Sequence, residues 1–143
     1  KPHLPAGVTV AVLGLAYKPL SHVIEESPGV YLCRALADAG YRVIGHDNLA
    51  AQGAGEELKM KAIVTDTIEE ALKDAEVVMI TTTDSTYLAL TAETLLQGRD
   101  KVTLVDFWRC LKHLAADPRI HYVPIGLCID DENAASALKS QWA

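Results

Sequence analysis

The sequence predicts an α/β protein, with a doubly wound, mostly parallel sheet, helices on both of its faces and a single domain. Short apolar runs rich in β-branched residues alternate with segments of helical periodicity, which is the pattern of repeated strand–helix–strand units. Several of these runs are apolar at consecutive positions, as expected for strands that are buried on both faces. A length of 143 residues, half of them hydrophobic, suits one domain with a core of ordinary size.

The first strand is predicted over residues 8–13, where VTVAVL is almost entirely apolar. Ser27 and Pro28 then have the residue types preferred at the N-cap and first position of a helix. That helix is expected to end at Gly40, which suits a left-handed cap. Its buried stripe is formed by Val30, Cys33, Leu36 and Ala37. The next strand is predicted over residues 41–46, which completes a βαβ unit with a right-handed crossover.

The middle of the chain continues the alternation. Residues 49–60 are predicted as a loop with a short helical segment, because glycines and alanines weaken the periodic signal. A short strand follows over residues 61–65. Residues 67–70, TIEE, match a capping box, and the helix that they begin has a buried stripe. The stripe consists of Ile68, Ala71, Leu72 and Ala75. A central strand is predicted over residues 76–81, EVVMIT.

The last third of the chain repeats the pattern with shorter elements. The predicted strands are residues 101–105 and 121–125. A polar turn is predicted over residues 82–87, and a helix follows it over residues 88–96. Two further helices are predicted, a short one that ends at Ala116 and one over residues 131–142.

Composition excludes several classes of function. The net charge of −6 and the pI near 5.3 argue against nucleic acid as a partner, because phosphate binding normally needs a basic face. No apolar window is as long as a membrane span and no signal peptide precedes the first strand, so we expect no membrane partner and a cytoplasmic location. Cys33, Cys110 and Cys128 are widely separated, as in reduced, buried cysteines. The five histidines lack ligand spacing, so no metal site is predicted.

The chain begins with KPHLP and has no initiator methionine. We therefore expect it to be a piece of a longer protein. Residues 1–7, which contain two prolines, are expected to form a linker before the first strand.

Ligands of doubly wound sheets bind beyond the carboxyl ends of the strands. After the first strand, residues 14–19 read GLAYKP and contain one of the three glycines of the dinucleotide fingerprint GxGxxG. The sequence therefore predicts a Rossmann-like domain that does not itself bind NAD. Asp47 stands where a ribose-binding acid is expected, but a lone aspartate at a strand exit is more often a turn residue.

Lys18 is the more informative polar residue of this edge. A lysine directly after a buried strand, beside the aromatic ring of Tyr17, can present a point charge to a phosphate or carboxylate. The alternative is an ordinary solvated loop lysine. Phe107 and Trp108 follow the strand at residues 101–105 and have rings that can stack on a base, although such aromatics more often belong to the core or to an interdomain contact.

These motifs together resemble the carboxyl-terminal, UDP-sugar-binding domain of the UDP-glucose and GDP-mannose dehydrogenase family. The family pattern is V-x-V-L-G-L-[AS]-[FY]-K-x-x-[TS]-D-D-x-R-x-S-P, and residues 10–18, VAVLGLAYK, match it nearly throughout. Ser21 and residues 26–28, ESP, fall at the expected spacing. Residues 82–87, TTDSTY, are similar to the family turn T-x-H-S-x-Y, and residues 105–106 are similar to the family strand end V-D-x-R.

The chain departs from the family pattern in the positions that carry charge. They are His22, Val23, Glu25, Asp84 and Trp108. The D-D-x-R run becomes HVIE, so an arginine is replaced by an acid that repels a pyrophosphate. The arginine after the late-strand aspartate becomes Trp108, with Arg109 one place later. Arg109 can substitute for it only if the turn shifts by one residue.

The resemblance implies a function for residues 1–143. They would bind a UDP-sugar or GDP-sugar within an NAD-dependent enzyme of polysaccharide biosynthesis, which oxidises the sugar 6-hydroxyl to a carboxylate through a thiohemiacetal on a cysteine. NAD and that cysteine would belong to the preceding, amino-terminal NAD-binding domain, which is a partner within the same chain. The fragment alone would be inactive, and the enzyme would be a homo-oligomer.

The resemblance also implies site residues. Tyr17, Lys18 and Arg109 are the expected substrate-binding residues, with Trp108 as a further candidate, and none of the cysteines falls in a catalytic motif. Two alternatives remain. One is a degenerate Rossmann-like interaction or oligomerisation module without nucleotide binding, which the departures from the family pattern favour. The other is a stand-alone dinucleotide-binding domain, which the missing glycines disfavour.

Overall fold

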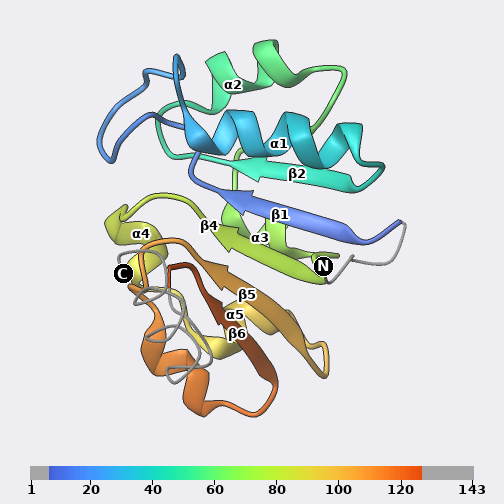
Figure 1. The fold of residues 1–143 in the computed structure, drawn as a ribbon, viewed down its shortest axis with the longest axis vertical. Helices are drawn as coiled ribbons and strands as arrows, with labels where there is room; N and C mark the ends of the chain where they lie inside the picture. The colour runs from blue at the N-terminus through green and yellow to red at the C-terminus, as the bar shows by residue number, and fades with distance from the viewer. Residues whose placement is uncertain (1–6, 127–143) are drawn as a thin grey trace, which may run out of the picture.

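The computed structural model describes residues 7–126, which form one sheet of six parallel strands with helices on both faces (Figure 1). The order across the sheet is β3-β2-β1-β4-β5-β6. The strands are β1 (Thr9–Leu13), β2 (Arg42–His46), β3 (Ile63–Thr65), β4 (Val77–Ile80), β5 (Val102–Asp106) and β6 (Ile120–Pro124). Because β1 and β4 are neighbours and the chain winds outward from each, the predicted doubly wound sheet is confirmed.

Two sets of helices cover the two faces of the sheet. The helices are α1 (Pro28–Asp38), α2 (Ala51–Leu58), α3 (Ile68–Leu72), α4 (Ser85–Leu88), α5 (Ala92–Leu96) and the 3-10 helix η1 (Lys112–Ala116). α1 and α2 pack on one face, and the other helices pack on the opposite face. β1 is buried at every position, as its apolar run predicts. Within residues 7–126, no helix has the length and apolar character needed to cross a membrane.

The strand register brings the carboxyl ends of four strands together. Leu13 at the end of β1 is paired with His46 of β2 and with Ile80 of β4. Ile80 is in turn paired with Asp106 of β5. The loops that follow these strands therefore emerge side by side at one edge of the sheet, and the arrowheads in Figure 1 all point toward this edge.

Local signals in the sequence place the helix ends as predicted. The Ser27 hydroxyl caps α1 by accepting a hydrogen bond from the Val30 amide at 3.3 Å, and Pro28 is the first helical residue. Gly40, with a φ of +92°, reverses the chain just after α1. Thr67 caps α3 by accepting a hydrogen bond from the Glu70 amide at 3.2 Å.

One expectation about helices is wrong, and a second understates the length of a helix. The helix predicted over residues 88–96 is two short helices, because Asp84 caps α4 inside the predicted turn and Thr91 caps α5. Residues 49–60 are mostly helical despite their glycines, because α2 buries Ala54 and Leu58 against the sheet, and burial outweighs weak propensity. The helix predicted over residues 131–142 lies outside the described residues.

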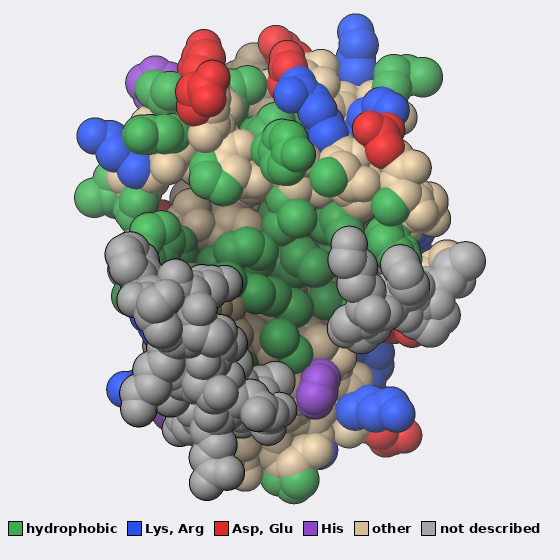
Figure 2. All heavy atoms as spheres, in the orientation of Figure 1, with side chains coloured by type: hydrophobic (Ala, Val, Ile, Leu, Met, Phe, Trp, Pro, Cys, Tyr) green, Lys and Arg blue, Asp and Glu red, His purple; other side chains and the backbone are tan. Residues whose placement is uncertain are grey.

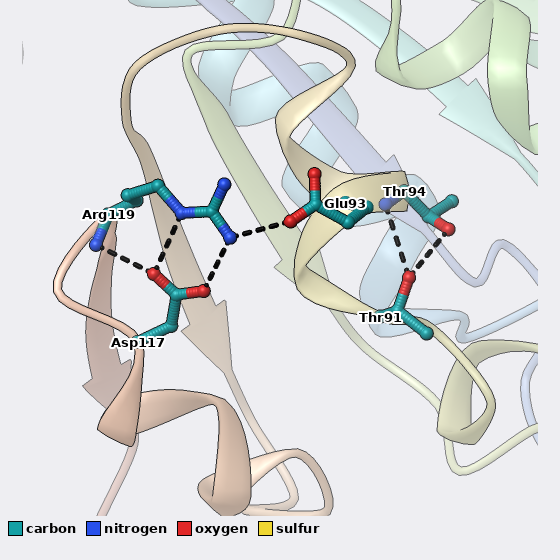
Figure 3. A network of polar contacts seen from close by, with 5 residues as sticks. All are labelled: Thr91, Glu93, Thr94, Asp117 and Arg119. Carbon is teal, nitrogen blue, oxygen red and sulfur yellow. Dashed lines mark hydrogen bonds and ion pairs between the residues drawn. The ribbon is translucent and has the colours of Figure 1, made fainter.

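A surface network joins α5 to the turn before β6 (Figure 3). The Arg119 guanidinium donates to both carboxylate oxygens of Asp117, at 3.0 and 2.8 Å, and to Glu93 at 2.6 Å. Thr91 accepts a hydrogen bond from the Thr94 amide at 3.3 Å. The network is exposed and lies near the amino ends of β5 and β6, so it contributes little stability and is remote from the edge where ligands bind.

Candidate functional site

The turn after β1 is closed by direct contact between backbones. Gly14 has a φ of +111°, and its carbonyl accepts a hydrogen bond from the Thr81 hydroxyl at 2.5 Å. A Cβ added to Gly29, in the first turn of α1, would lie 1.9 Å from the same carbonyl oxygen. A pyrophosphate bound as in dinucleotide-binding folds occupies the gap between such a strand and helix. In this chain the Gly14 carbonyl and the Thr81 hydroxyl fill that gap.

Asp47 holds two turns together at the end of β2. One carboxylate oxygen accepts hydrogen bonds from the amides of Leu15 and Ala16 at 2.8 and 3.0 Å. The other accepts from the amides of Leu49 and Ala50 at 2.9 and 2.8 Å. The side chain is buried, and both of its oxygens are occupied by the protein itself. The interpretation of Asp47 as a turn residue is therefore confirmed, and the carboxylate is not free to bind a ribose.

The other carboxylates at the strand ends are also engaged internally. Asp84 accepts hydrogen bonds from the Asn48 side-chain amide at 3.1 Å and from the Thr86 amide at 2.9 Å. Asp106 is fully buried and accepts from the Leu111 amide at 2.8 Å and from the Tyr122 hydroxyl at 2.9 Å. Burial alone would raise the pKa of Asp106, but these hydrogen bonds hold the pKa below its ordinary value.

The four residues predicted to bind the substrate lie on two loops of this edge. Tyr17 and Lys18 follow β1, and Trp108 and Arg109 follow β5. All four side chains are exposed, with 56% for Tyr17 and 61% for Trp108. Among residues 7–126, neither Lys18 nor Arg109 has a hydrogen bond or ion pair through its side chain. The carboxylates of the strand ends are thus engaged in hydrogen bonds within the protein, whereas the side chains of Lys18 and Arg109 remain available to an anionic ligand.

Trp108 has a defined orientation despite its exposure. Its indole N–H donates to the carbonyl of Thr81 at 2.8 Å, and its backbone amide donates to Asp106 at 3.2 Å. The ring is therefore anchored between the ends of β4 and β5 with one side open to solvent. This arrangement suits stacking against a planar group.

Backbone strain is concentrated in the same two loops. Of the four non-glycine residues with positive φ among residues 7–126, Leu20, Glu26 and Arg109 lie in the loops after β1 and β5. Such conformations cost energy and are often found where a site requires them. Glu25 and Glu26 are exposed in the first loop and add negative charge beside Lys18 in sequence.

A cavity lies beside this edge, on the face that carries α1. Its volume is about 630 Å³. The lining includes Ser27, Tyr31, Arg34, Thr81 and Phe107, but none of the four predicted site residues. Sequence reasoning missed this cavity, because its walls come from the first turn of α1 and the ends of β4 and β5. One signal was available in the sequence. Thr81 and Phe107 directly follow two adjacent strands at matching positions, so their side chains are expected to point to the same face of the sheet.

His46 and Tyr87 form a buried polar pair beneath the edge. The Tyr87 hydroxyl donates to the His46 carbonyl at 2.9 Å and lies 2.9 Å from the imidazole Nδ1. Both side chains are buried, and burial lowers the pKa of His46. The pair packs the end of β2 against α4, so Tyr87 of the TTDSTY turn is part of the core.

The buried His46 predicts a loss of stability at acid pH. The unfolded chain takes up a proton near pH 6.5, but the folded chain resists protonation because its pKa is lower. The free energy of unfolding should therefore be constant above pH 6.5 and should decrease as the pH falls below it. Urea denaturation between pH 5 and 8 measures this slope. His46→Asn should flatten it, and His22→Asn in the exposed loop should leave it intact; an unchanged slope in His46→Asn would contradict the assignment.

Neither described cysteine has the character of a nucleophile. Burial raises the thiol pKa of Cys33 to about 12 and that of Cys110 to about 11. Both therefore remain protonated at neutral pH, while Cys128 lies outside the described residues. Among residues 7–126, no three His, Cys, Asp or Glu side chains are grouped so that they could hold a metal ion.

The fold and the loops at the carboxyl ends of the strands define a doubly wound α/β domain of the nucleotide-binding type. In this domain the Gly14 carbonyl and the Thr81 hydroxyl occupy the space between β1 and α1 that a dinucleotide would need. A family model, described as the UDP binding domain of the UDP-glucose/GDP-mannose dehydrogenase family, matches residues 11–113. The chain belongs to this family and corresponds to its UDP binding domain. The resemblance seen in the sequence motifs is thereby confirmed.

Individual relatives agree with this assignment. UDP-glucose 6-dehydrogenase YwqF of Bacillus subtilis is 36% identical over 76 residues, which are 53% of this chain and 17% of that protein. UDP-glucose 6-dehydrogenase AglM of Haloferax volcanii is 36% identical over 87 residues, which are 61% of this chain and 20% of that protein. A UDP-glucose dehydrogenase structure from Pyrobaculum islandicum has a TM-score of 0.66 and 27% identity, covering 85% of this chain and 25% of that one. The chain therefore spans a quarter or less of these relatives.

Proposed function

We propose that this chain is the nucleotide-sugar-binding domain of an NAD-dependent 6-dehydrogenase that oxidises the sugar of a UDP-sugar or GDP-sugar to a uronic acid. The observation that carries the proposal is the run VAVLGLAYK at the centre of the sheet. It lies largely within the stretch that the family model matches, and it ends in Tyr17 and Lys18, beyond the carboxyl end of β1. Doubly wound sheets generally bind ligands on this side. Lys18 and Arg109 are the cations available to the pyrophosphate, and Trp108 offers a ring for stacking.

The remaining parts of the enzyme belong to the rest of the protein. NAD and the catalytic cysteine are assigned to an amino-terminal domain, because the β1–α1 turn is filled and the described cysteines are buried or half-buried thiols. The present chain alone would then be inactive, and residues 1–7 would be the link to that domain. The full enzyme would work in the cytoplasm as a homo-oligomer.

The full-length protein tests this function through binding. Isothermal titration with UDP-glucose, a UDP-N-acetylhexosamine and GDP-mannose should show binding of at least one of them. NADH formation with the sugar that binds should then be measurable by absorbance. Absence of binding to all three would refute the proposal.

Lys18→Ala should weaken binding of that nucleotide sugar about 10- to 100-fold, which corresponds to the loss of one hydrogen bond to a charged group. Lys59→Ala is a matched control, because Lys59 is an exposed lysine beside the start of β2, at the opposite edge of the sheet. Dissociation constants of both full-length variants measure the effect. Equal affinities of the two variants would exclude Lys18 from the site.

A second candidate function is the degenerate module without nucleotide binding. The exposed Glu25 and Glu26 favour it, since they place two acids in the loop where the family pattern has an arginine. This candidate predicts a full-length protein that assembles normally and binds none of the three nucleotide sugars. The titration described above therefore discriminates between the two.

A further inference from the structure

One buried side chain closes the loop after β5. Asp106 is the last residue of β5 and is fully buried. One of its carboxylate oxygens accepts hydrogen bonds from the Trp108 amide at 3.2 Å and from the Cys110 thiol at 3.5 Å. The other accepts from the Leu111 amide at 2.8 Å and from the hydroxyl of Tyr122, on β6, at 2.9 Å. Asp106 therefore binds the loop at two places and joins it to the neighbouring strand.

The tip of this loop is exposed and strained. Arg109 has a φ of +56°, in the left-handed region that glycine adopts freely and that other residues adopt only at a cost in energy. It lies between Trp108 and Leu111, whose amides both donate to the Asp106 carboxylate. Because hydrogen bonds to an ionised acceptor are stronger than those between neutral groups, this carboxylate is able to maintain a strained turn. The chain thus keeps an arginine where a glycine would relieve the strain.

The surface beside the loop supplies no free cation of its own. Figure 2 shows mainly hydrophobic side chains at the centre of the face that carries α1, with the acidic side chains toward its margins. Over β5 this face is only half-covered, since Thr103 and Val105 are half-buried. The cavity on this face contains Arg34 in its lining, but the guanidinium of Arg34 forms an ion pair with Glu57. The positive charge for a ligand near the end of β5 therefore has to come from Arg109.

We propose that Asp106 is a positioning residue, which holds the turn around Arg109 in its strained conformation and so presents Arg109 and Trp108 together to the ligand. Trp108 is fixed by this turn on one side and by the hydrogen bond from its indole N–H to the Thr81 carbonyl, at 2.8 Å, on the other. Because Asp106 is fully buried, it acts through the loop and not by contact with the ligand. The role rests on the proposed function, in which that ligand is a nucleotide sugar.

Asp106→Asn separates this role from that of an ordinary core aspartate, which would stabilise the fold without determining the conformation of Arg109. In either orientation of the asparagine side chain, its N–H₂ group faces the Trp108 amide or the Leu111 amide, so one of the two bonds that flank Arg109 is lost.

Asp117→Asn is the matched control. The Asp117 carboxylate also accepts several hydrogen bonds, from the amide and the guanidinium of Arg119 at 2.8–3.0 Å, but it lies in the turn before β6, away from the loop after β5.

Thermal unfolding of the 143-residue chain tests whether Asp106 maintains the strain. Arg109→Gly should raise Tm by about 3 °C, because glycine adopts the left-handed region freely. In the Asp106→Asn background the turn is free to relax, so the same substitution should raise Tm by less than about 1 °C. In the Asp117→Asn background the full gain should remain. No gain in the natural chain, or an equal gain in all three backgrounds, would overturn the proposal.

Hydrogen exchange of the natural chain needs no variant, and it decides the matter if Asp106→Asn does not fold. The amides of Trp108 and Leu111 should exchange slowly although the tip of the loop is exposed, because both donate to the buried carboxylate. Exchange of both amides at the rate of an unfolded chain would overturn the proposal.

Nucleotide-sugar binding by the full-length protein tests the presentation itself, at a temperature where circular dichroism shows every variant to be folded. Asp106→Asn and Arg109→Ala should each weaken binding about 10-fold. The double variant should lose much less than about 100-fold, because both changes disable the same group. Asp117→Asn should bind within about 2-fold of the natural protein.

Two results of this titration would contradict the positioning role: losses that multiply in the double variant, or an unchanged affinity in Asp106→Asn. Absence of binding by the natural protein would instead refute the proposed function and the ligand named here. The Tm comparison involves no nucleotide, so it decides separately whether Asp106 holds the turn.

Discussion

Gly29→Ala is expected to destabilise the domain by about 3 kcal/mol or more, which is a large part of the stability of a protein of this size. The added methyl group would lie 1.9 Å from the Gly14 carbonyl oxygen and 3.2 Å from the Thr81 hydroxyl. The first of these neighbours is backbone at the end of a central strand, so it cannot move without shifting β1 against α1. Guanidinium denaturation monitored by far-UV circular dichroism measures the loss.

Gly53→Ala is the control for this prediction. Gly53 lies inside α2, and its added methyl group would meet only the Ile24 side chain at 3.7 Å. Alanine has a higher helix propensity than glycine, so this variant should gain up to about 1 kcal/mol. If Gly29→Ala were as stable as the natural protein, the close packing of α1 on Gly14 would be incorrect.

Asp47→Asn is expected to cost about 3 kcal/mol, although it changes the size of the side chain very little. The carboxylate accepts hydrogen bonds from four backbone amides in a buried position. An asparagine presents an oxygen to one pair of amides and an N–H₂ group to the other pair. Two buried donors then face a donor, and the charge that strengthened all four bonds is lost.

Chemical denaturation of Asp47→Asn and Asp100→Asn compares the same substitution in two environments. Asp100 is exposed in the turn before β5, and it accepts no hydrogen bond through its side chain from the described residues. Its replacement should change the free energy of unfolding by less than about 0.5 kcal/mol. A similar small change in Asp47→Asn would mean that the two turns are held together by other contacts.

Much of the fold was predictable because its signals are local. The apolar run of β1 required burial on both faces, and Ser27 with Pro28 located the start of α1 within one residue. The helix prediction failed between residues 82 and 96, where Asp84 and Thr91 each begin a separate helix. Their side chains hydrogen-bond to nearby amides, and a periodic apolar pattern does not reveal which polar residues will act as caps.

The candidate site was predictable only in part. The family motif directed attention to Tyr17 and Lys18, and both follow the carboxyl end of β1. This is the end at which doubly wound sheets in general bind ligands. The sequence contained no sign that Trp108 would be anchored on the carbonyl of Thr81, because β4 and β5 supply the two groups from distant parts of the chain. The binding roles of these residues remain predictions for the experiments above.

The sequence by itself determined the alternation of strands and helices and the family. It also determined the absence of a glycine-rich dinucleotide loop. Each of these features depends on short, contiguous sequence patterns. Only the tertiary structure decided what fills that loop and which surface stays open. The contacts of Asp47 with Leu15 and of Gly29 with Gly14 join residues that are far apart in the chain. The half-covered face of β5 likewise depends on where all of the helices pack. Such features arise from the register of the assembled sheet, which no single segment encodes.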